Sequence, residues 1–405
     1  MSLIKWGALL CIALGAGVVT PCTAADTTIS DNVIKIGILN DRSGAYADLG
    51  GEGSVVAARM AAEEFGNAID GVPIEIVSAD HQNKPDIGLG IVRRWFDTEK
   101  VDVVADISNS GVGFAITPLA KERHKIILNA SASSDFTGKA CTDTSFQWIY
   151  SSYTNGYGLA RALTQQKLDS WFLITVDYAF GHAFAADMRK AVQASGGKVL
   201  GEVRHPLNTA DFGSVLLQAQ SSGAKVVALA NAGADMTNAV KQASEFGINK
   251  TQVVAAPTVF LTDVDAIGLA AAQGLQFVTA FYWDRDEASR AWSQKFFALR
   301  GRMPTMTQAG MYSAVRHYLR AVQAAKSDDG VTVAAKMRAL PVSDAFSAHG
   351  YLRQDGQFMH DMYIARVNKP AESKQRWDYY NIVATIPAED AFRPLTEGGC
   401  PLVSQ

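Results

Sequence analysis

The feature that most constrains the fold is an alternation of short apolar strands with helices, which begins near residue 33 and restarts near residue 171. In the first series, strands are predicted at 33–39, 73–79, 101–107 and 125–129, with a helix after each of the first three. These strands are apolar at nearly every position, which is typical of a parallel sheet covered on both faces by helices. The first series therefore predicts an α/β domain.

A second series repeats the pattern. Its strands are predicted at 171–176, 199–204, 225–230, 252–256 and 274–281. Helices follow at 288–300, 307–325 and 331–339, and the segments 358–367 and 377–386 then resemble antiparallel strands with Asp355-Gly356 as a turn. Since 405 residues suffice for two domains, we expect two α/β lobes with parallel sheets.

The first 24 residues have the composition of a secretory signal peptide. Lys5 precedes an apolar stretch at 6–19, and Pro21 is followed by the small residues of 22–25. The stretch is shorter than the ~20 residues that span a bilayer, although a retained N-terminal anchor is the alternative. We predict cleavage after Ala24 or Ala25 and an exported mature protein.

Export changes how the cysteines are interpreted. Only Cys141 and Cys400 remain after cleavage, and an oxidising compartment favours a disulfide between them; two buried thiols are the alternative. Without the leader, which carries only Lys5, 36 basic and 40 acidic residues give a net charge of −4. A near-neutral chain without a basic run gives no electrostatic reason to bind nucleic acid.

Searches for enzyme motifs give no candidate for catalysis. Nucleotide-binding, serine-hydrolase, zinc-protease and C-x-x-C motifs are missing from the sequence, and the seven histidines lack metal-ligand spacing. We therefore predict neither an enzyme nor a metal or cofactor site, although an exported hydrolase remains a rival. Asp80-His81 ends a predicted strand and could face a cleft.

Two polar loops of small residues follow neighbouring strands. Ligands of open α/β sheets sit outside the carboxyl ends of the strands, where hydroxyls and helix-start N–H groups suit a carboxylate. Ordinary helix capping is the alternative interpretation. The candidate residues of these loops are Ser108, Asn109, Ser110, Ala130 and Ser131.

Aromatic residues gather at comparable places in the second half. They occur at 148–153, where the chain passes between domains, at 177–181 and at 281–283. Their rings could stack on a flat ligand, or they could belong to the core. The remaining candidate ligand-binding residues are Tyr150, Tyr153, Phe180 and Phe281, together with Asn231 and Thr258, which follow strands of the second series.

Here the chain resembles a known family. Ile36-Gly37-Ile38 leading to Ser43-Gly44, the serine loops and the 177–181 motif are similar to type I periplasmic solute-binding proteins of ABC transporters, in particular the leucine/isoleucine/valine-binding family. The segments 80–86 and 141–148 look like a branch that includes binders of aromatic acids. The resemblance extends over residues 31–405.

The resemblance implies two Rossmann-like lobes joined by three crossovers. The N-terminal lobe would comprise 31–147 and 282–345, and the C-terminal lobe 148–281 and 346–405. The serine loops match the family's carboxylate loops, Phe180 its aromatic contact, and Thr258 the region where amino-acid binders place an acid for the ligand ammonium. Since residues 257–259 hold no acid, we favour an aromatic acid, unless Asp235 or Asp263 supplies the charge.

The function implied is capture of a small carboxylate solute by lobe closure in the periplasm, for delivery to an ABC transporter permease. The partners would be the solute and the permease, the protein would be a monomer, and no cofactor is implied. A branched-chain or other amino-acid binder and a periplasmic sensor for a receptor kinase are the alternatives. The predicted signal peptide opposes a DNA-binding regulator of related fold.

Overall fold

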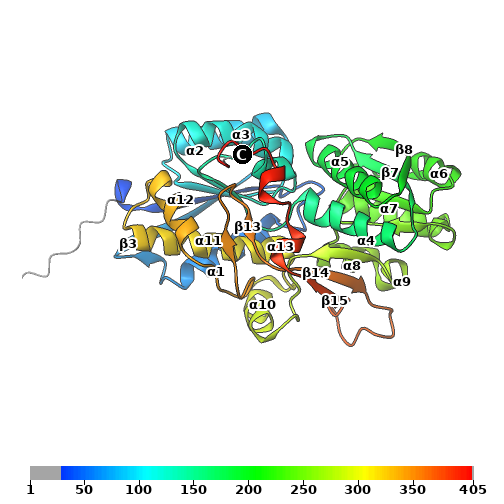
Figure 1. Ribbon diagram of the computed structural model, residues 1–405. Helices are drawn as coiled ribbons and strands as arrows, with labels where there is room; N and C mark the ends of the chain where they lie inside the picture. Colours follow the sequence, from blue (N-terminus) through cyan, green and yellow to red (C-terminus); the bar gives the residue numbers. More distant parts are fainter. Residues whose placement is uncertain (1–28, 404–405) are drawn as a thin grey trace, which may run out of the picture.

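The computed structural model describes residues 29–403, which form two α/β lobes side by side (Figure 1). The first lobe contains a six-stranded sheet of order β2-β3-β1-β4-β5-β6, in which β2 pairs antiparallel with β3 and the other neighbours are parallel. Its strands are β1 (Ile34–Asn40), β2 (Ala68–Ile69), β3 (Val72–Asp80), β4 (Val103–Ile107), β5 (Ile126–Asn129) and β6 (Ser145–Gln147). The predicted first α/β domain is confirmed.

Helices cover both faces of this sheet. On one face α1 packs against α11, and α11 against α12, while α2 packs against α3 on the other. Gly37 in β1 allows this close packing, because a Cβ there would lie 2.5 Å from the Trp95 ring of α2. The helices are α1 (Gly51–Glu63), α2 (Pro85–Asp97), α3 (Ser110–Glu122), α10 (Glu287–Arg300), α11 (Met306–Ala325) and α12 (Gly330–Ala339).

The second lobe has a four-stranded parallel sheet of order β10-β9-β7-β8. Its strands are β7 (Ser170–Val176), β8 (Lys198–His205), β9 (Val226–Ala230) and β10 (Val253–Ala255). Its helices are α4 (Gly158–Gln165), α5 (Ala179–Ala194), α6 (Gly213–Ser221), α7 (Gly233–Glu245), α8 (Leu261–Ile267) and α9 (Leu269–Ala272). The fully buried strands β7 and β9 explain why their sequences are apolar throughout.

A third, antiparallel sheet has the order β11-β14-β15. Its strands are β11 (Gln276–Thr279), β14 (Met362–Val367) and β15 (Tyr380–Ile386), and a short antiparallel pair is formed by β12 (Tyr351–Leu352) and β13 (Phe358–Met359). The predicted strand at 358–367 is therefore divided at residues 360–361 into β13 and β14. Buried His360 marks the break, where Nε2 contacts the Ile149 carbonyl at 3.0 Å.

The C-terminal tail, expected at 346–405 in the second lobe, divides its contacts. Strands β14 and β15 extend from β11, whereas Gln357 forms a β-bridge with Gln147 at the end of β6. After α13 (Ala388–Ala391), the Arg393 guanidinium donates to the Ser134 carbonyl at 2.8 Å. The tail therefore contacts first-lobe segments before β14 and after α13.

The predicted pairing of the two remaining cysteines is confirmed. Cys141 and Cys400 form a disulfide with their Cα atoms 5.6 Å apart. The bond fixes the end of the tail to the segment between β5 and β6.

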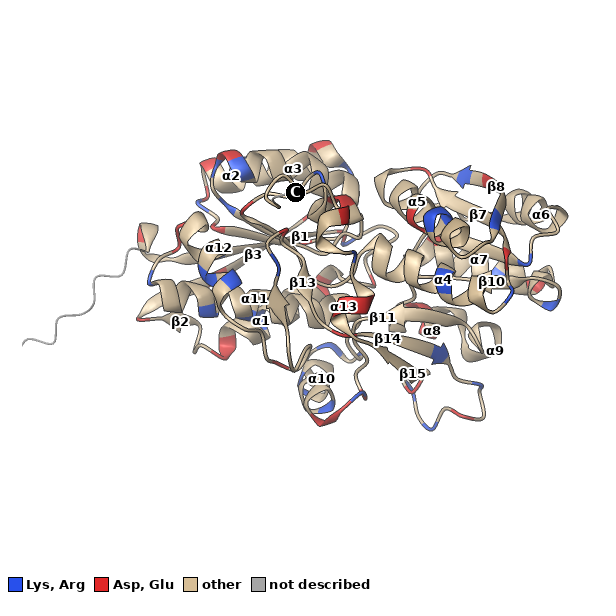
Figure 2. Cartoon of the chain, in the orientation of Figure 1, with Lys and Arg blue, Asp and Glu red and all other residues tan. Residues whose placement is uncertain are grey.

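Figure 2 shows charges of both signs spread over the helices and loops of both lobes. Within residues 29–403, no helix is long and apolar enough to cross a membrane. The predicted signal peptide at 1–24 lies outside the described residues.

Candidate functional site

The two lobes meet through the loop that follows β1. Tyr46 of this loop places its hydroxyl 2.6 Å from the hydroxyl of Tyr178, which follows β7. At the start of α7, the Ala234 N–H donates to the Ala45 carbonyl at 3.1 Å. Gly233 makes this approach possible, since its φ is +59° and a Cβ there would lie 2.3 Å from the Ala45 oxygen. The loop therefore closes against the second lobe.

The conformation of this loop is held by buried Asp41. Its Oδ1 accepts the Gly44 N–H at 2.7 Å, and its Oδ2 accepts the Tyr46 N–H at 2.8 Å. Asn83 donates to the same Oδ2 at 2.6 Å. The carboxylate thereby fixes the backbone that carries Tyr46.

The first serine loop lies at the carboxyl end of β4. Asn109 caps α3, because its Oδ1 accepts the Val112 N–H at 3.1 Å. Ser108 Oγ lies 3.3 Å from His81 Nε2, and His81 Nδ1 accepts the Asn83 N–H at 3.0 Å. The ring proton is therefore on Nε2 and donated to Ser108. Burial lowers the pKa of His81 to about 4, so the ring is neutral at pH 7.

The second serine loop follows β5 and meets the first. Ser131 donates from its N–H and its hydroxyl to Asn129 Oδ1, at 2.9 and 2.5 Å. The Ser133 N–H points at Ser110 Oγ across 3.4 Å, and Ala130 is buried. Capping and an adjacent arrangement of the two loops are thus both present in the structure.

An aromatic group lies where the loop after β1 meets the second lobe. The Phe180 ring centroid lies 6.4 Å from that of Tyr46 and 5.8 Å from that of Tyr178, so rings from both lobes take part. Tyr150 meets Phe260 edge-on at 6.3 Å. Burial raises the pKa of Tyr46, Tyr150 and Tyr178 above the usual range, so all three hydroxyls are neutral donors at pH 7.

The other predicted site residues have different surroundings. Phe281 packs against Trp292 and Phe346, beside α10, and not against the group around Tyr46. Tyr153 stacks on Tyr157 at 4.4 Å in a π-helical turn, and burial raises its pKa to about 12.

Two further predicted residues lie at strand ends of the second lobe. Asn231 Nδ2 lies 3.1 Å from His205 Nε2, while its Oδ1 is buried without a hydrogen-bond partner among the described residues. Thr258 accepts from Asn155 Nδ2 at 3.4 Å, and the same amide donates to the Val278 carbonyl. Asn155 therefore links Thr258 to β11, whereas the Oδ1 atom of Asn231 remains able to accept a hydrogen bond.

Three buried carboxyl groups surround the tyrosines. Burial raises the pKa of Asp235 to about 6 and that of Asp106 and Asp263 to about 7. Asp235 interacts electrostatically with Tyr46 and Tyr178, and the other two carboxyls with Tyr150. The sequence analysis named Asp235 and Asp263 only as possible charges.

Asp106 was missed altogether, although an acid in an otherwise apolar strand is a signal. It has a left-handed φ of 62°, and its Oδ2 accepts from Asn40 at 2.6 Å. Its Oδ1 and that of Asp235 are buried without a hydrogen-bond partner in the described part of the chain. Asp235 Oδ2 accepts the Asn208 N–H at 3.2 Å, and the backbone N–H of Thr209 also interacts with this carboxyl group.

Residues 33–374 match the family model described as periplasmic binding protein. The chain belongs to this family. A periplasmic binding protein from Burkholderia mallei is 45% identical, with 92% of this chain and 100% of that one covered and a TM-score of 0.90. A branched chain amino acid ABC transporter periplasmic ligand-binding protein from Burkholderia xenovorans LB400 is 40% identical, with 91% and 99% covered and a TM-score of 0.81.

Other relatives are more distant. Leu/Ile/Val-binding protein homolog 6 of Brucella abortus (strain 2308) is 26% identical over 208 residues. These residues are 50% of this chain and 52% of the relative, so this periplasmic binding protein spans about half the length of the curated relatives it matches. A solute binding protein from R. palustris in complex with benzoate has a TM-score of 0.79 at 19% identity, covering 91% and 99%, and shares the fold. The family resemblance and the two-lobed fold are confirmed.

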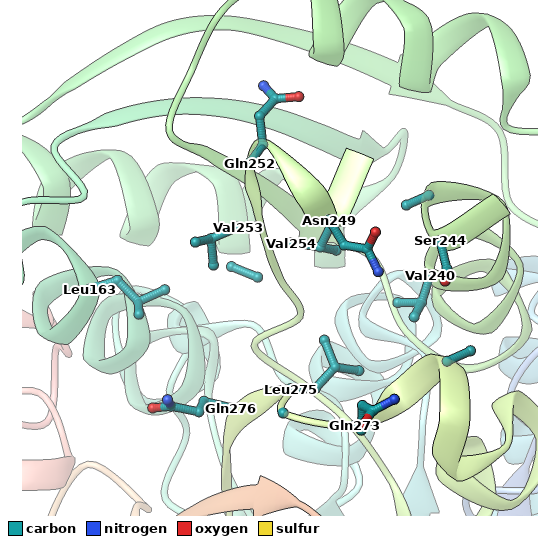
Figure 3. Close-up of a pocket in the computed structure, with 14 residues that line it drawn as sticks. Leu163, Val240, Ser244, Asn249, Gln252, Val253, Val254, Gln273, Leu275 and Gln276 are labelled. Atoms are coloured by element: carbon teal, nitrogen blue, oxygen red, sulfur yellow. The ribbon is translucent and has the colours of Figure 1, made fainter. Parts of the chain in front are cut away.

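A separate cavity of about 250 Å³ lies in the second lobe of this periplasmic binding protein (Figure 3). It opens between β10 and β11, which belong to different sheets, and its walls include Leu163 of α4 and Val240 of α7. Polar side chains around it are amides and a hydroxyl, such as Gln273 and Gln276. Its lining contains none of the predicted site residues. Over residues 29–403, no cluster of three or more His, Cys, Asp or Glu suited to a metal ion occurs.

Proposed function

We propose that this periplasmic binding protein captures an amino acid between its lobes and presents it to the permease of an ABC importer. The observation that carries the proposal is Asp235, whose Oδ1 is buried beside the Tyr46–Tyr178 pair without a hydrogen-bond partner in residues 29–403. A buried carboxylate needs a cationic or hydrogen-bonding partner, and a ligand ammonium group would supply one.

This proposal moves the ligand from an aromatic acid toward its amine-bearing alternative. The aromatic acid was favoured because 257–259 holds no acid, but Asp235 offers a carboxylate from α7 instead. With a pKa of about 6, this group is mostly ionised at pH 7. A solute without an amine would leave Asp235 Oδ1 without a partner among the described residues.

The carboxylate end of the solute would be held by the serine loops. Ser110 begins α3 and its hydroxyl faces the Ser133 N–H, so first-turn N–H groups and hydroxyls converge at one edge of the sheet. Helix N-termini of this kind favour anions. Phe180, Tyr46 and Tyr178 would contact the solute's side chain.

Capture would proceed by closure of the lobes, as in other hinged two-lobed proteins. The contacts of Ala45 and Tyr46 with the second lobe describe the closed arrangement. We further propose that residues 1–24 direct export to the periplasm. A sensor for a receptor kinase would use the same binding chemistry, so co-purification with permease components separates the two partners.

The test is a thermal-shift series on protein that has been unfolded and refolded to remove carried-over solute. Leucine, valine, phenylalanine and glutamate are compared with benzoate, hydroxybenzoates and cinnamates. A solute at 100 times its Kd adds ~2.7 kcal/mol of stability, which is a shift of several degrees. We expect shifts with amino acids. Shifts with the aromatic acids alone would contradict the role of Asp235 and restore the ligand class favoured by the sequence.

A further inference from the structure

A second set of contacts joins the lobes, away from Tyr46. Asp187 of α5, in the second lobe, accepts from the Ser134 hydroxyl at 3.0 Å and the Ser152 hydroxyl at 2.6 Å, both at Oδ2. Ser134 follows β5 in the first lobe, and Ser152 lies in the segment that passes between the lobes. Both serines are buried. One carboxylate oxygen of α5 therefore holds the first lobe and the crossover segment together.

The C-terminal strap, defined as residues 393–400, lies over this contact. Its Arg393 guanidinium donates to the Ser134 carbonyl at 2.8 Å and interacts electrostatically with Asp187. Packing is close, because a Cβ on Gly138 would lie 2.6 Å from the Gly398 carbonyl oxygen. The disulfide from Cys400 to Cys141 attaches the end of the strap covalently to the first lobe.

The strap also reaches α5. Glu397 forms an ion pair with Lys190 at 2.9 Å, one helical turn from Asp187. Strap residue Arg393 is itself held from the first-lobe side, since the Arg353 guanidinium donates to its carbonyl at 2.9 Å. The strap is thus anchored on one lobe and contacts the other.

We propose that Asp187 is a positioning residue for lobe closure and that, with the strap, it stabilises the closed arrangement even without solute. The bond from the Ser134 hydroxyl to Asp187 Oδ2 and the Glu397–Lys190 pair break when the lobes separate, while the disulfide keeps the strap in place for the next closure. We call Asp187 and the strap together the latch. Its contacts join the two lobes directly, so its effect does not depend on which solute is bound.

The test measures the distance between spin labels in the solute-free protein. Labels are attached at Lys121→Cys on α3 and Gln220→Cys on α6, two exposed positions on different lobes. Breaking a hydrogen-bonded carboxylate contact shifts a two-state equilibrium by roughly a factor of five or more, and an exposed pair by about two. We expect Asp187→Ala to raise the separated population about five-fold, and Lys190→Gln about two-fold.

Arg189→Gln is the matched control, because Arg189 lies on the same helix but pairs with Glu202 inside the second lobe at 2.8 Å. This variant should keep the distances of the unmodified protein. If Asp187→Ala does not fold, Ser134→Ala removes the first-lobe partner instead and should raise the separated population. An unchanged distribution in the folded variant, or a starting protein whose lobes are fully separated, would overturn the latch. Either result leaves solute binding at Asp235 untouched.

Discussion

The two walls of the candidate site between the lobes differ in how their polar groups are paired. In the serine loops of the first lobe, Ser131 bonds to Asn129 and Ser108 to His81. On the second lobe, Asp235 and Asn231 each keep a buried oxygen without a partner among the described residues. The serine hydroxyls of the first wall therefore have partners before a solute arrives, although Asn129 Nδ2 and Asp106 Oδ1 of the same lobe are also buried without a partner among the described residues. On the second wall, a solute would supply the partner that Asp235 Oδ1 lacks.

This difference indicates an order of events. The ordered serine loops would bind a carboxylate with little rearrangement, because the cost of ordering them is already met in the fold. The exception is the Ser131 hydroxyl, which would turn from Asn129 Oδ1 to the solute. An unpaired carboxylate gains most when the lobes close and a cation reaches it. We expect the first lobe to bind the solute's carboxylate first, and the ion pair between Asp235 and the solute's ammonium group to stabilise the closed arrangement.

The variant expected to change solute affinity most is Asp235→Asn, which tests the second wall. Removing the charge from a buried ion pair should weaken amino-acid binding about a hundred-fold, equivalent to ~3 kcal/mol. Isothermal titration with the amino acid found in the thermal-shift series measures it. Glu245→Gln, an exposed acid on the same helix, is the control and should bind normally. Equal affinities would remove the distinction between the walls.

The second largest effect is expected when Ser110 and Ser131 of the first wall are both replaced by Ala. The Ser110 hydroxyl, and the Ser131 hydroxyl once it turns from Asn129, would each donate to the solute's carboxylate. At about 0.5–1.5 kcal/mol per hydrogen bond, losing both should weaken binding about twenty-fold. Because Ser131 also bonds to Asn129, the melting temperature should fall too. Unchanged affinity in a folded double variant would contradict the proposal that the serine loops bind the solute's carboxylate.

A pH series gives opposite signs for binding and stability. Below the Asp235 pKa of about 6, protonation removes the ammonium's partner, so affinity should fall by up to about ten-fold per pH unit. Stability of the solute-free protein has the other sign. Asp106 and Asp263 have a pKa of about 7 in the folded protein, so they still bind a proton at pH 5–6, where a carboxyl group of the unfolded chain has lost it. The free energy of unfolding should therefore decrease as pH rises from 4 to 7.

Titration calorimetry checks the sign for affinity, and urea unfolding checks the sign for stability, both between pH 4 and pH 8. Asp235→Asn supplies the control, because it should flatten the pH dependence of affinity. A variant that retains the full slope would assign the titration to another group.

The smallest expected effect belongs to Phe180→Leu. Phe180 contacts Tyr178 within the second lobe and Tyr46 of the first lobe. A smaller side chain should therefore change the preference between leucine and phenylalanine by about three-fold. Competition binding with the two amino acids measures this ratio. A uniform loss for both would indicate that the ring only packs.

The fold could be read from the sequence because its signals are local. Apolar strands such as 226–230 are fully buried, and their positions in the chain predict a parallel sheet. The division of 358–367 could not be predicted, since it depends on the contact of His360 with Ile149, which are remote in the sequence. The divided contacts of the tail are likewise made with partners such as Gln147.

Parts of the candidate site were predictable for the same reason. Ser108 and Ser131 follow strands, and strand ends meet at one edge of a sheet. Asp235 in the first turn of a helix looks like ordinary capping, and only its burial beside Tyr46 distinguishes it. Phe281 was predicted with the aromatic group, but its neighbours Trp292 and Phe346 come from segments whose approach the sequence does not reveal.

The packing of α1 on α11 also concerns how the polypeptide is made. Helix α1 ends at Glu63, while its packing partner begins only at Met306, after the whole second lobe has been synthesised. On a ribosome all six strands of the first sheet emerge by residue 147, but α11, which covers α1, follows only after the four strands of the second sheet. During synthesis the nascent first lobe exposes the apolar face of α1, and a chaperone that shields this face should bind long before the last strand emerges.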